Sequence, residues 1–303
     1  MAGAVQGLSI GELAEAAGVS VKTVRFYSDS GVLPESGRSA GGHRRYGEEA
    51  LERLRTVRRL RALGLGLPAV EGVLRGGAGL DEALARQRAE VGRRLTELRW
   101  NEAALEALAL AGPEGLELLG DALRTTPTTD ALAAFWRRVL PARLPARLVS
   151  AIVDAAVPEL PSAPTAQQAL AYARLHALAT DRAAAAAVRE ASAGDYDAVL
   201  YYEGLGEAYE LAGLELAGRE PGDGLAPGAA LDCFVAAHAA AKGKVDSADF
   251  RRSLTLQLRN RVDPLMLAYW SLSAQLRPAE AGPDMGTAHA WLLTALKQRY
   301  PAA

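Results

Sequence analysis

The chain has 303 residues, which is more than one simple core holds and fits two domains joined by a connector. Its net charge is only −2, but residues 38–61 hold eight arginines against three glutamates, and residues 190–232 hold ten acids against one arginine. The basic block suits a phosphate backbone, whereas the acidic block would repel one. The single cysteine excludes an internal disulfide and argues against a thiolate metal cluster. With no signal peptide and no apolar run that could span a membrane, we expect a cytoplasmic protein without a membrane partner.

Two short helices joined by a glycine turn are predicted close to the N-terminus. Ser9 and Glu12 form a capping box, and apolar residues follow it at helical spacing. Gly18 allows a sharp turn, because it has no Cβ to clash at positive φ. Ser20 then caps a second helix, which Gly31 ends. This pattern is typical of a helix-turn-helix, whose second helix can enter the major groove of DNA.

A segment rich in Gly, Ser and Arg, residues 34–46, follows the second helix and suits a β-hairpin or wing. It ends in Gly-His-Arg-Arg-Tyr at 42–46, after Val-Arg-Phe-Tyr at 24–27 and Ser-Gly-Val-Leu-Pro at 30–34. This ordered set resembles the MerR family of transcriptional regulators. The resemblance covers roughly the first third of the chain, and it implies a winged helix-turn-helix domain that binds double-stranded DNA.

Side chains for DNA contact are expected on the second helix and on the wing. Lys22 and Thr23 are the candidates for base edges. Arg25, Tyr27, Arg44 and Tyr46 are expected to hold phosphates, since most protein–DNA contacts position the protein and few specify the sequence. The complete predicted set is Ser20, Lys22, Thr23, Arg25, Tyr27, Arg38, His43, Arg44, Arg45 and Tyr46.

One long helix without proline is predicted over residues 80–110, about 45 Å long at 1.5 Å per residue. Leucine or valine recurs every seven positions, which indicates the seam of a coiled coil, although Arg88 and Glu102 interrupt its second position. The predicted dimerisation residues are Leu84, Val91, Leu95, Leu98 and Leu105. Packing within the same subunit is the alternative. Members of the family pair this helix antiparallel, but the sequence itself does not fix the direction.

The remainder reads as helices separated by Pro, Gly or Asp, including one helix over residues 165–192, with few β-branched residues. The four histidines show no ligand spacing, and no nucleotide loop is present, so we expect no metal, no cofactor and no enzyme activity. The predicted fold is all-α apart from a small β wing. Its parts are a winged helix-turn-helix domain in residues 1–76, a dimerisation coiled-coil helix in 77–112, a linker in 113–128 and an all-helical effector-binding domain in 129–303.

The stretch 195–210 suggests a ligand site, because tyrosines and glutamates occupy neighbouring helical stripes. Gly204 and Gly206 would each cost about 1 kcal/mol in a helix interior, and a binding wall would explain both. Glutamates beside tyrosine faces would attract a cationic or amphipathic organic ligand. The predicted ligand residues are Tyr201, Tyr202, Glu203, Tyr209, Trp136 and Trp270. The alternatives are that these rings are core, that Gly204 ends a helix, and that the acids are solvated.

The resemblance implies a mechanism as well as a fold. A homodimer would bind a promoter whose spacer is too long, bend and untwist it, and so realign the promoter elements for RNA polymerase. We expect a small organic ligand in the C-terminal helical domain to control this step. A ligand-independent regulator whose C-terminal domain is a protein-interaction module is the open alternative.

Overall fold

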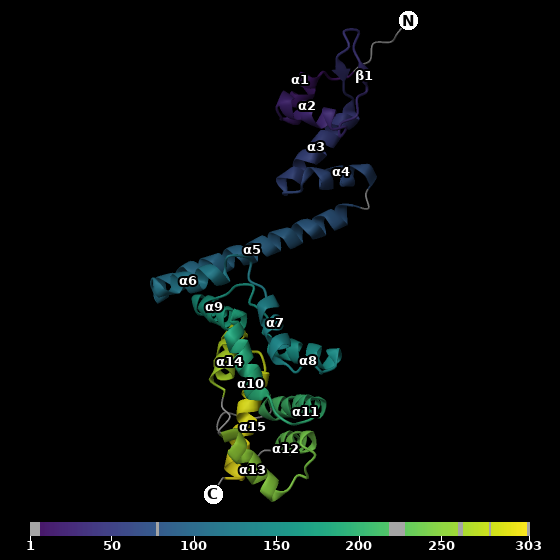
Figure 1. Cartoon of the computed structure of the whole chain (residues 1–303). Helices are drawn as coiled ribbons and strands as arrows, with labels where there is room; N and C mark the ends of the chain where they lie inside the picture. The colour runs from purple at the N-terminus through teal and green to yellow at the C-terminus, as the bar shows by residue number, and fades with distance from the viewer. Residues whose placement is uncertain (1–6, 77–78, 218–227, 260–262, 279, 302–303) are drawn as a thin grey trace. The chain divides into compact units, whose positions relative to one another are not determined.

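The computed structural model describes residues 7–76, 79–217, 228–259, 263–278 and 280–301. Within these ranges the chain forms fifteen helices and one two-stranded antiparallel sheet (Figure 1). The expected fold class, all-α with a small β wing, is therefore confirmed. The chain divides into two compact units, Met1–Leu95 and Thr96–Ala303. This division falls inside the helix predicted for dimerisation, and not at residue 76.

The first unit is the predicted helix-turn-helix with its wing. Its elements are α1 (Ile10–Ala17), α2 (Val21–Asp29), β1 (Gly37–Arg38), β2 (Arg44–Arg45), α3 (Glu48–Ala62) and α4 (Leu67–Gly76). The capping box forms as expected: Ser9 N donates to Glu12 Oε2 at 2.7 Å, and Glu12 N donates to Ser9 Oγ at 3.3 Å. Gly18 has φ +64°, so the turn between α1 and α2 uses the left-handed conformation that glycine permits.

A single apolar core holds this unit together. Leu13, Val24 and Leu54 from three successive helices are fully buried in it. The wing joins the same core through its last residue, Tyr46, which is also fully buried and pairs with Leu8 in an isolated bridge. In the sheet, Gly37 lies opposite Arg45 and Arg38 lies opposite Arg44. The wing is therefore fixed to the helices at its base.

The helix α5 (Leu80–Ala111) belongs to both units. It has 32 residues, about 48 Å at 1.5 Å per residue, as the sequence predicts. Its first turns pack Ala83 into the core of the first unit, and its later turns bury Trp100 and Ala107 in the second.

The second unit contains α6 (Glu114–Ala122), α7 (Asp130–Val139), α8 (Ala146–Ala156), α9 (Ala166–Thr180), α10 (Arg182–Ser192), α11 (Ala198–Ala217), α12 (Ala229–Ala241), α13 (Ala248–Arg259), α14 (Pro264–Leu276) and α15 (Met285–Arg299). Two expectations need correction. The segment 113–128 contains α6, which buries Leu119 in the core and is not a linker. The single helix predicted over 165–192 breaks at Asp181, whose carboxylate accepts from Ala183 N at 2.8 Å and so starts α10.

Two apolar clusters lie inside the second unit. The first gathers residues from α5 to α10 and from α14 around Phe135, Tyr172 and Tyr269. The second gathers α11, α12, α13 and α15 around Phe234 and Leu292. None of the helices in the described part of the chain is both long and apolar enough to cross a membrane.

Candidate nucleic-acid interface and effector region

The recognition helix α2 is held by its own N-cap and by its apolar face. Ser20 Oγ accepts from Thr23 N at 3.1 Å and shares a hydrogen bond with Thr23 Oγ1 at 2.8 Å. Val24 is fully buried, and Tyr27 is almost fully buried. Lys22 and Arg25 lie on the exposed side of the helix. Of the residues predicted here, Lys22 and Arg25 are thus free to meet DNA, whereas Tyr27 is mainly a core residue.

Phe26 is a residue of this surface that the prediction missed. Its side chain is 56% exposed, although it is large and apolar. It lies two positions after the buried Val24, about 200° round the helix at 100° per residue, so it projects outward beside Arg25. A helical projection of α2 would have revealed it. An exposed aromatic ring next to a cation suits sugar or thymine-methyl contacts.

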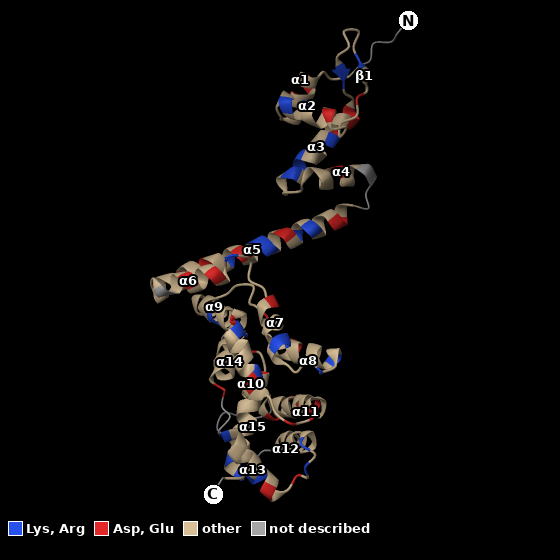
Figure 2. Ribbon diagram, in the orientation of Figure 1, with Lys and Arg blue, Asp and Glu red and all other residues tan. Residues whose placement is uncertain are grey.

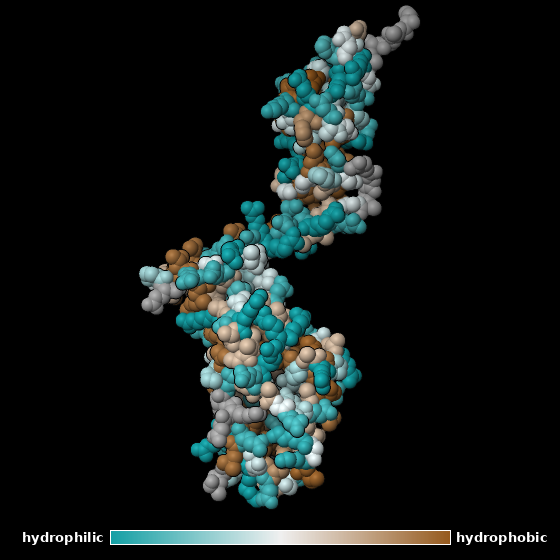
Figure 3. Space-filling model, viewed as in Figure 1, coloured by the Kyte–Doolittle hydropathy of each residue, from teal (hydrophilic) through white to brown (hydrophobic). Residues whose placement is uncertain are grey.

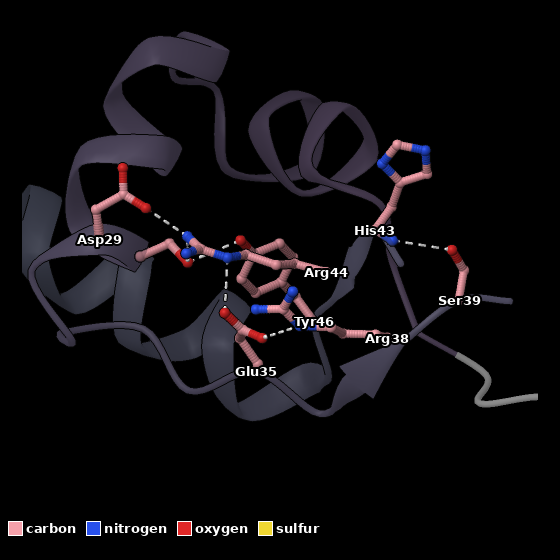
Figure 4. Close-up of polar contacts among 8 residues, drawn as sticks. Asp29, Glu35, Arg38, Ser39, His43, Arg44 and Tyr46 are labelled. Carbon is pink, nitrogen blue, oxygen red and sulfur yellow. Dashed lines mark hydrogen bonds and ion pairs between the residues drawn. The ribbon is translucent and has the colours of Figure 1, made fainter. Parts of the chain in front are cut away.

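The wing carries a polar network that reaches back to α2. Arg44 lies with its guanidinium between Asp29 and Glu35, at N–O distances of 2.5 and 2.7 Å (Figure 4). Its Nη1 also donates to Ser28 Oγ at 2.9 Å, and the Tyr46 hydroxyl donates to the same oxygen at 2.8 Å. The hydrogen bond with Asp29 is the main reason that the pKa of Arg44 is raised.

Tyr46 therefore needs correction as a DNA contact. Its side chain has no exposed area, and its hydroxyl is bonded to the buried Ser28. A ring in that position cannot reach a phosphate, so Tyr46 is a structural residue that fixes the base of the wing.

Successive residues of a strand point to opposite faces, which explains why neighbouring side chains of the wing have different partners. Arg44 and Tyr46 face α2. Arg45 faces the other way, donates to Gly7 O at 3.4 Å and lies 3.9 Å from Glu12. His43 lies near the tip, where its backbone N–H donates to Ser39 Oγ at 3.2 Å.

The arginines of α3 (blue in Figure 2) largely make contacts within their own unit. Arg53 pairs with Glu49 at 3.0 Å and Arg55 with Glu52 at 2.5 Å, one helical turn away in each case. Arg58 donates to Ala17 O and braces the turn after α1. Several arginines of the basic block at residues 38–61 therefore stabilise the fold of the first unit.

The predicted dimerisation residues lie mostly on an open face of α5. Leu98 is 58% exposed and Leu105 is 70% exposed, and Val91 and Leu95 are exposed as well. Apolar side chains gather on the surface over the later part of α5 and α6 (Figure 3). Leu84 instead packs against the core of the first unit. The face that carries Val91, Leu95, Leu98 and Leu105, called the seam below, is exposed among the residues that the structure describes.

The predicted ligand region is divided by the structure. Tyr202 packs against the first cluster of the second unit, together with Trp136 and Trp270, whose rings lie 5.5 Å apart. Tyr201 and Tyr209 pack against the second cluster. The rings of Tyr201 and Tyr202 nevertheless lie 5.2 Å apart, so the predicted residues are distributed over two clusters that adjoin at the start of α11.

Gly204 and Glu203, two of the residues that suggested a binding wall, make other contacts. A Cβ added to Gly204 would lie 2.5 Å from Ala237 Cβ, so this glycine permits close packing of α11 on α12. Glu203 pairs with Arg147 on α8 at 2.9 Å. The argument that Gly204 admits a ligand to the backbone is therefore wrong. Around Gly206, in contrast, no atom would meet an added Cβ within 4 Å.

The buried His238 and the half-buried His289 mark a feature that their spacing in the sequence did not indicate. His289 Nδ1 shares a hydrogen bond of 2.9 Å with the Tyr209 hydroxyl, and Phe234 contacts both His238 and His289. Burial lowers the pKa of His238 to about 3 and that of His289 to about 4. Across the described ranges, no three His, Cys, Asp or Glu side chains gather as metal ligands would.

The first unit thus defines a winged helix-turn-helix DNA-binding domain. Residues 8–77 match the profile of the MerR HTH family regulatory proteins. The mercuric resistance operon regulatory protein of Serratia marcescens is 38% identical over 112 residues, which cover 35% of this chain and 78% of that protein. The chain therefore belongs to the MerR family.

Two further relatives share a smaller part of their length. The nodulation protein NolA of a Bradyrhizobium species (strain NC92) is 42% identical over 93 residues, 30% of this chain and 39% of that protein. The transcriptional activator TipA of Streptomyces coelicolor is 38% identical over 119 residues, 39% of this chain and 45% of that protein. The chain thus spans less than half of these two relatives. The family profile itself ends at residue 77 and does not extend into the second unit.

Proposed function

We propose that the chain regulates transcription by binding promoter DNA as a homodimer. The observation that carries this proposal is the surface of α2, where Lys22, Arg25 and Phe26 are exposed above a buried apolar face. Lys22 and Thr23 meet base edges, Thr23 through its methyl group because its hydroxyl is hydrogen-bonded to Ser20. Arg25 on the helix and Arg38, His43 and Arg45 on the wing are the residues for phosphates.

Pairing through the seam of α5 supplies the second half-site. One helix-turn-helix reads one half-site, and a twofold axis relates two of them on a palindromic operator. Exposed Val91, Leu95, Leu98 and Leu105 support this pairing, because contiguous apolar surface is costly when it stays in water. The dimer bends and untwists the promoter and so aligns its elements for RNA polymerase, as the family resemblance implies.

The second unit is proposed to sense a small organic ligand. The support that remains is the group of Trp136, Trp270 and Tyr202, which lie on one apolar cluster. Aromatic faces of this kind suit a cationic or amphipathic compound. A protein-interaction module is the second candidate. It is favoured by exposed apolar residues on α11, Leu200 and Leu214.

Selection of duplexes from a random-sequence pool tests the proposal directly. We expect the full chain to select a palindromic sequence, and footprinting to show protection of two half-sites related by symmetry. Lys22→Ala should relax preference at one base position by about 1–3 kcal/mol. Failure to select any sequence would contradict the proposal. Trp fluorescence during a screen of cationic dyes separates the two candidate roles of the second unit, since only the ligand-sensing role predicts quenching that Trp270→Phe reduces.

A further inference from the structure

One basic side chain ties the wing to the recognition helix. The guanidinium of Arg44 contacts Asp29 at 2.5 Å, Glu35 at 2.7 Å and Ser28 Oγ at 2.9 Å (Figure 4). Ser28 and Asp29 form the last turn of α2, and Glu35 lies in the segment between α2 and β1. Arg44 itself lies on β2. The contacts therefore connect three successive parts of the DNA-binding unit through one planar group.

Buried side chains of α2 and the wing support this connection. Ser28 is almost fully buried, and its hydroxyl accepts from both Arg44 and Tyr46. Tyr46 is fully buried, and its backbone pairs with Leu8. Because strand residues two apart share a face, Arg44 and Tyr46 converge on the same point of α2. The wing therefore has a fixed base, on which the orientation of its outer residues depends.

The charges around Arg44 argue against a direct phosphate contact. Two carboxylates already neutralise it. A phosphate would have to compete with both acids. Arg38, the partner of Arg44 across the sheet, is 61% exposed and lies 3.5 Å from a single acid, Glu35. Arg38 is the better placed of the two to meet DNA.

We propose that Arg44 is a positioning residue for DNA binding. It holds no phosphate, but fixes the wing against the C-terminal turn of α2, so that Arg38 and His43 meet the backbone in register with the bases that α2 reads. It also neutralises Asp29 and Glu35, which would otherwise repel the duplex. This inference rests on the proposed DNA-binding function.

The difference between arginine and lysine provides the test. A lysine binds a phosphate as a point charge, but it cannot reproduce a planar fork that reaches three acceptors. The probes are a duplex that the wild-type full chain selects from a random-sequence pool and a scrambled duplex of equal length. Binding of both is measured by fluorescence anisotropy over a range of KCl concentrations. The variants are Arg44→Lys, Arg44→Gln, Arg38→Lys and Arg38→Gln.

We expect Arg44→Lys to lower the preference for the selected duplex over the scrambled one about tenfold, a coupling typical of residues in one network. Binding of the scrambled duplex and its salt slope should stay as in the wild type, because the charge is kept. Arg38→Lys should leave both quantities unchanged. Arg38→Gln should lower the salt slope on both duplexes by about 0.9, the value for one phosphate contact, and leave the preference unchanged.

The inference is overturned if Arg44→Lys keeps the wild-type preference, or if Arg44→Gln behaves as Arg38→Gln does. A wild-type chain that selects no duplex would overturn the proposed function and this inference with it.

Substitution of Asp29 and Glu35 is a second, independent test, because the two possible roles of Arg44 predict opposite changes in DNA binding. If Arg44 binds a phosphate, Asp29→Asn and Glu35→Gln free it and tighten binding of the selected duplex. If Arg44 positions the wing, the same variants lower the preference severalfold. Glu49→Gln on α3, which loses the same charge away from this network, is the control for general electrostatics. Thermal unfolding of each variant reports folding, and the acid variants decide the question if the Arg44 variants do not fold.

Discussion

The helix-turn-helix unit and the helical second unit contain the same kinds of residue but use them differently. In the first unit, the residues of the ordered motifs converge: Arg44 and Tyr46 of the wing meet Ser28 of the recognition helix. In the second unit, the acid and the glycine that suggested a ligand site contact α8 and α12 instead. The comparison teaches that several motifs in fixed order indicate a site, whereas unusual composition within one helix is often explained by the helix packed against it.

The largest effect is expected at the seam of α5. Leu98→Glu should give monomers in sedimentation velocity, because a buried leucine contributes roughly 1.5–3 kcal/mol and each dimer contains two. Palindromic DNA binding should be lost with it. Ala89→Glu adds the same charge at an exposed position on the opposite side of the helix and should leave the dimer intact. A dimeric Leu98→Glu protein would place the interface elsewhere.

Acid should destabilise the second unit through His238 and His289. Folding lowers the pKa of His238 to about 3 and of His289 to about 4, so both are neutral when folded, while the unfolded chain takes up protons below its ordinary pKa near 6.5. The stability they contribute is complete above pH 6.5 and falls as the pH drops towards 4. At pH 5 the loss is about 2 kcal/mol for each histidine.

Urea unfolding at pH 7.5 and pH 5, followed by Trp fluorescence, measures this loss. A double variant, His238→Gln with His289→Asn, should lose much less stability between the two pH values than the wild type does. Equal losses would show that other groups cause the acid sensitivity.

Two glycines in α11 allow the effect of close packing on stability to be distinguished from the effect of helix propensity. Gly204→Ala should destabilise the second unit by about 1–3 kcal/mol, because its Cβ would meet Ala237 at 2.5 Å and α12 must shift. Gly206→Ala meets no atom within 4 Å and should stabilise α11 by about 0.5–1 kcal/mol. Hydrogen exchange of α11 and α12 peptides resolves both effects. If both substitutions stabilised the unit, the close contact with α12 would not explain why position 204 is a glycine.

The smallest effect is expected for Glu203→Gln. Its ion pair with Arg147 is exposed, and such pairs contribute from nothing to about 1 kcal/mol. Thermal unfolding should therefore hardly change. If the same substitution abolished quenching of Trp fluorescence by a cationic dye, the original assignment of Glu203 to a ligand site would be restored.

Local rules made the first unit predictable. The capping box, the turn at Gly18 and the stop at Gly31 each depend on a few neighbouring residues, and all appear in the structure. The burial of Tyr46 was not predicted, because it depends on a hydroxyl eighteen residues away. The two-residue strand β2 gives too short a pattern to show which side chains face inward.

For the second unit, the sequence predicted the helices but not the contacts between them. The close approach at Gly204 depends on Ala237, thirty-three positions further along, and no periodicity within α11 reveals that neighbour. The break at Asp181 is different. Asp is a strong N-cap, so the end of α9 and the start of α10 could have been predicted from this residue type alone.

The contact between α11 and α12 has a mechanical consequence. Where a glycine lies against an alanine, almost no side chain separates the two backbones, and nothing between them can rearrange its rotamers to absorb a displacement. At this point the backbones of the two helices are in direct contact, so a displacement of α11 near Gly204 is passed on to α12.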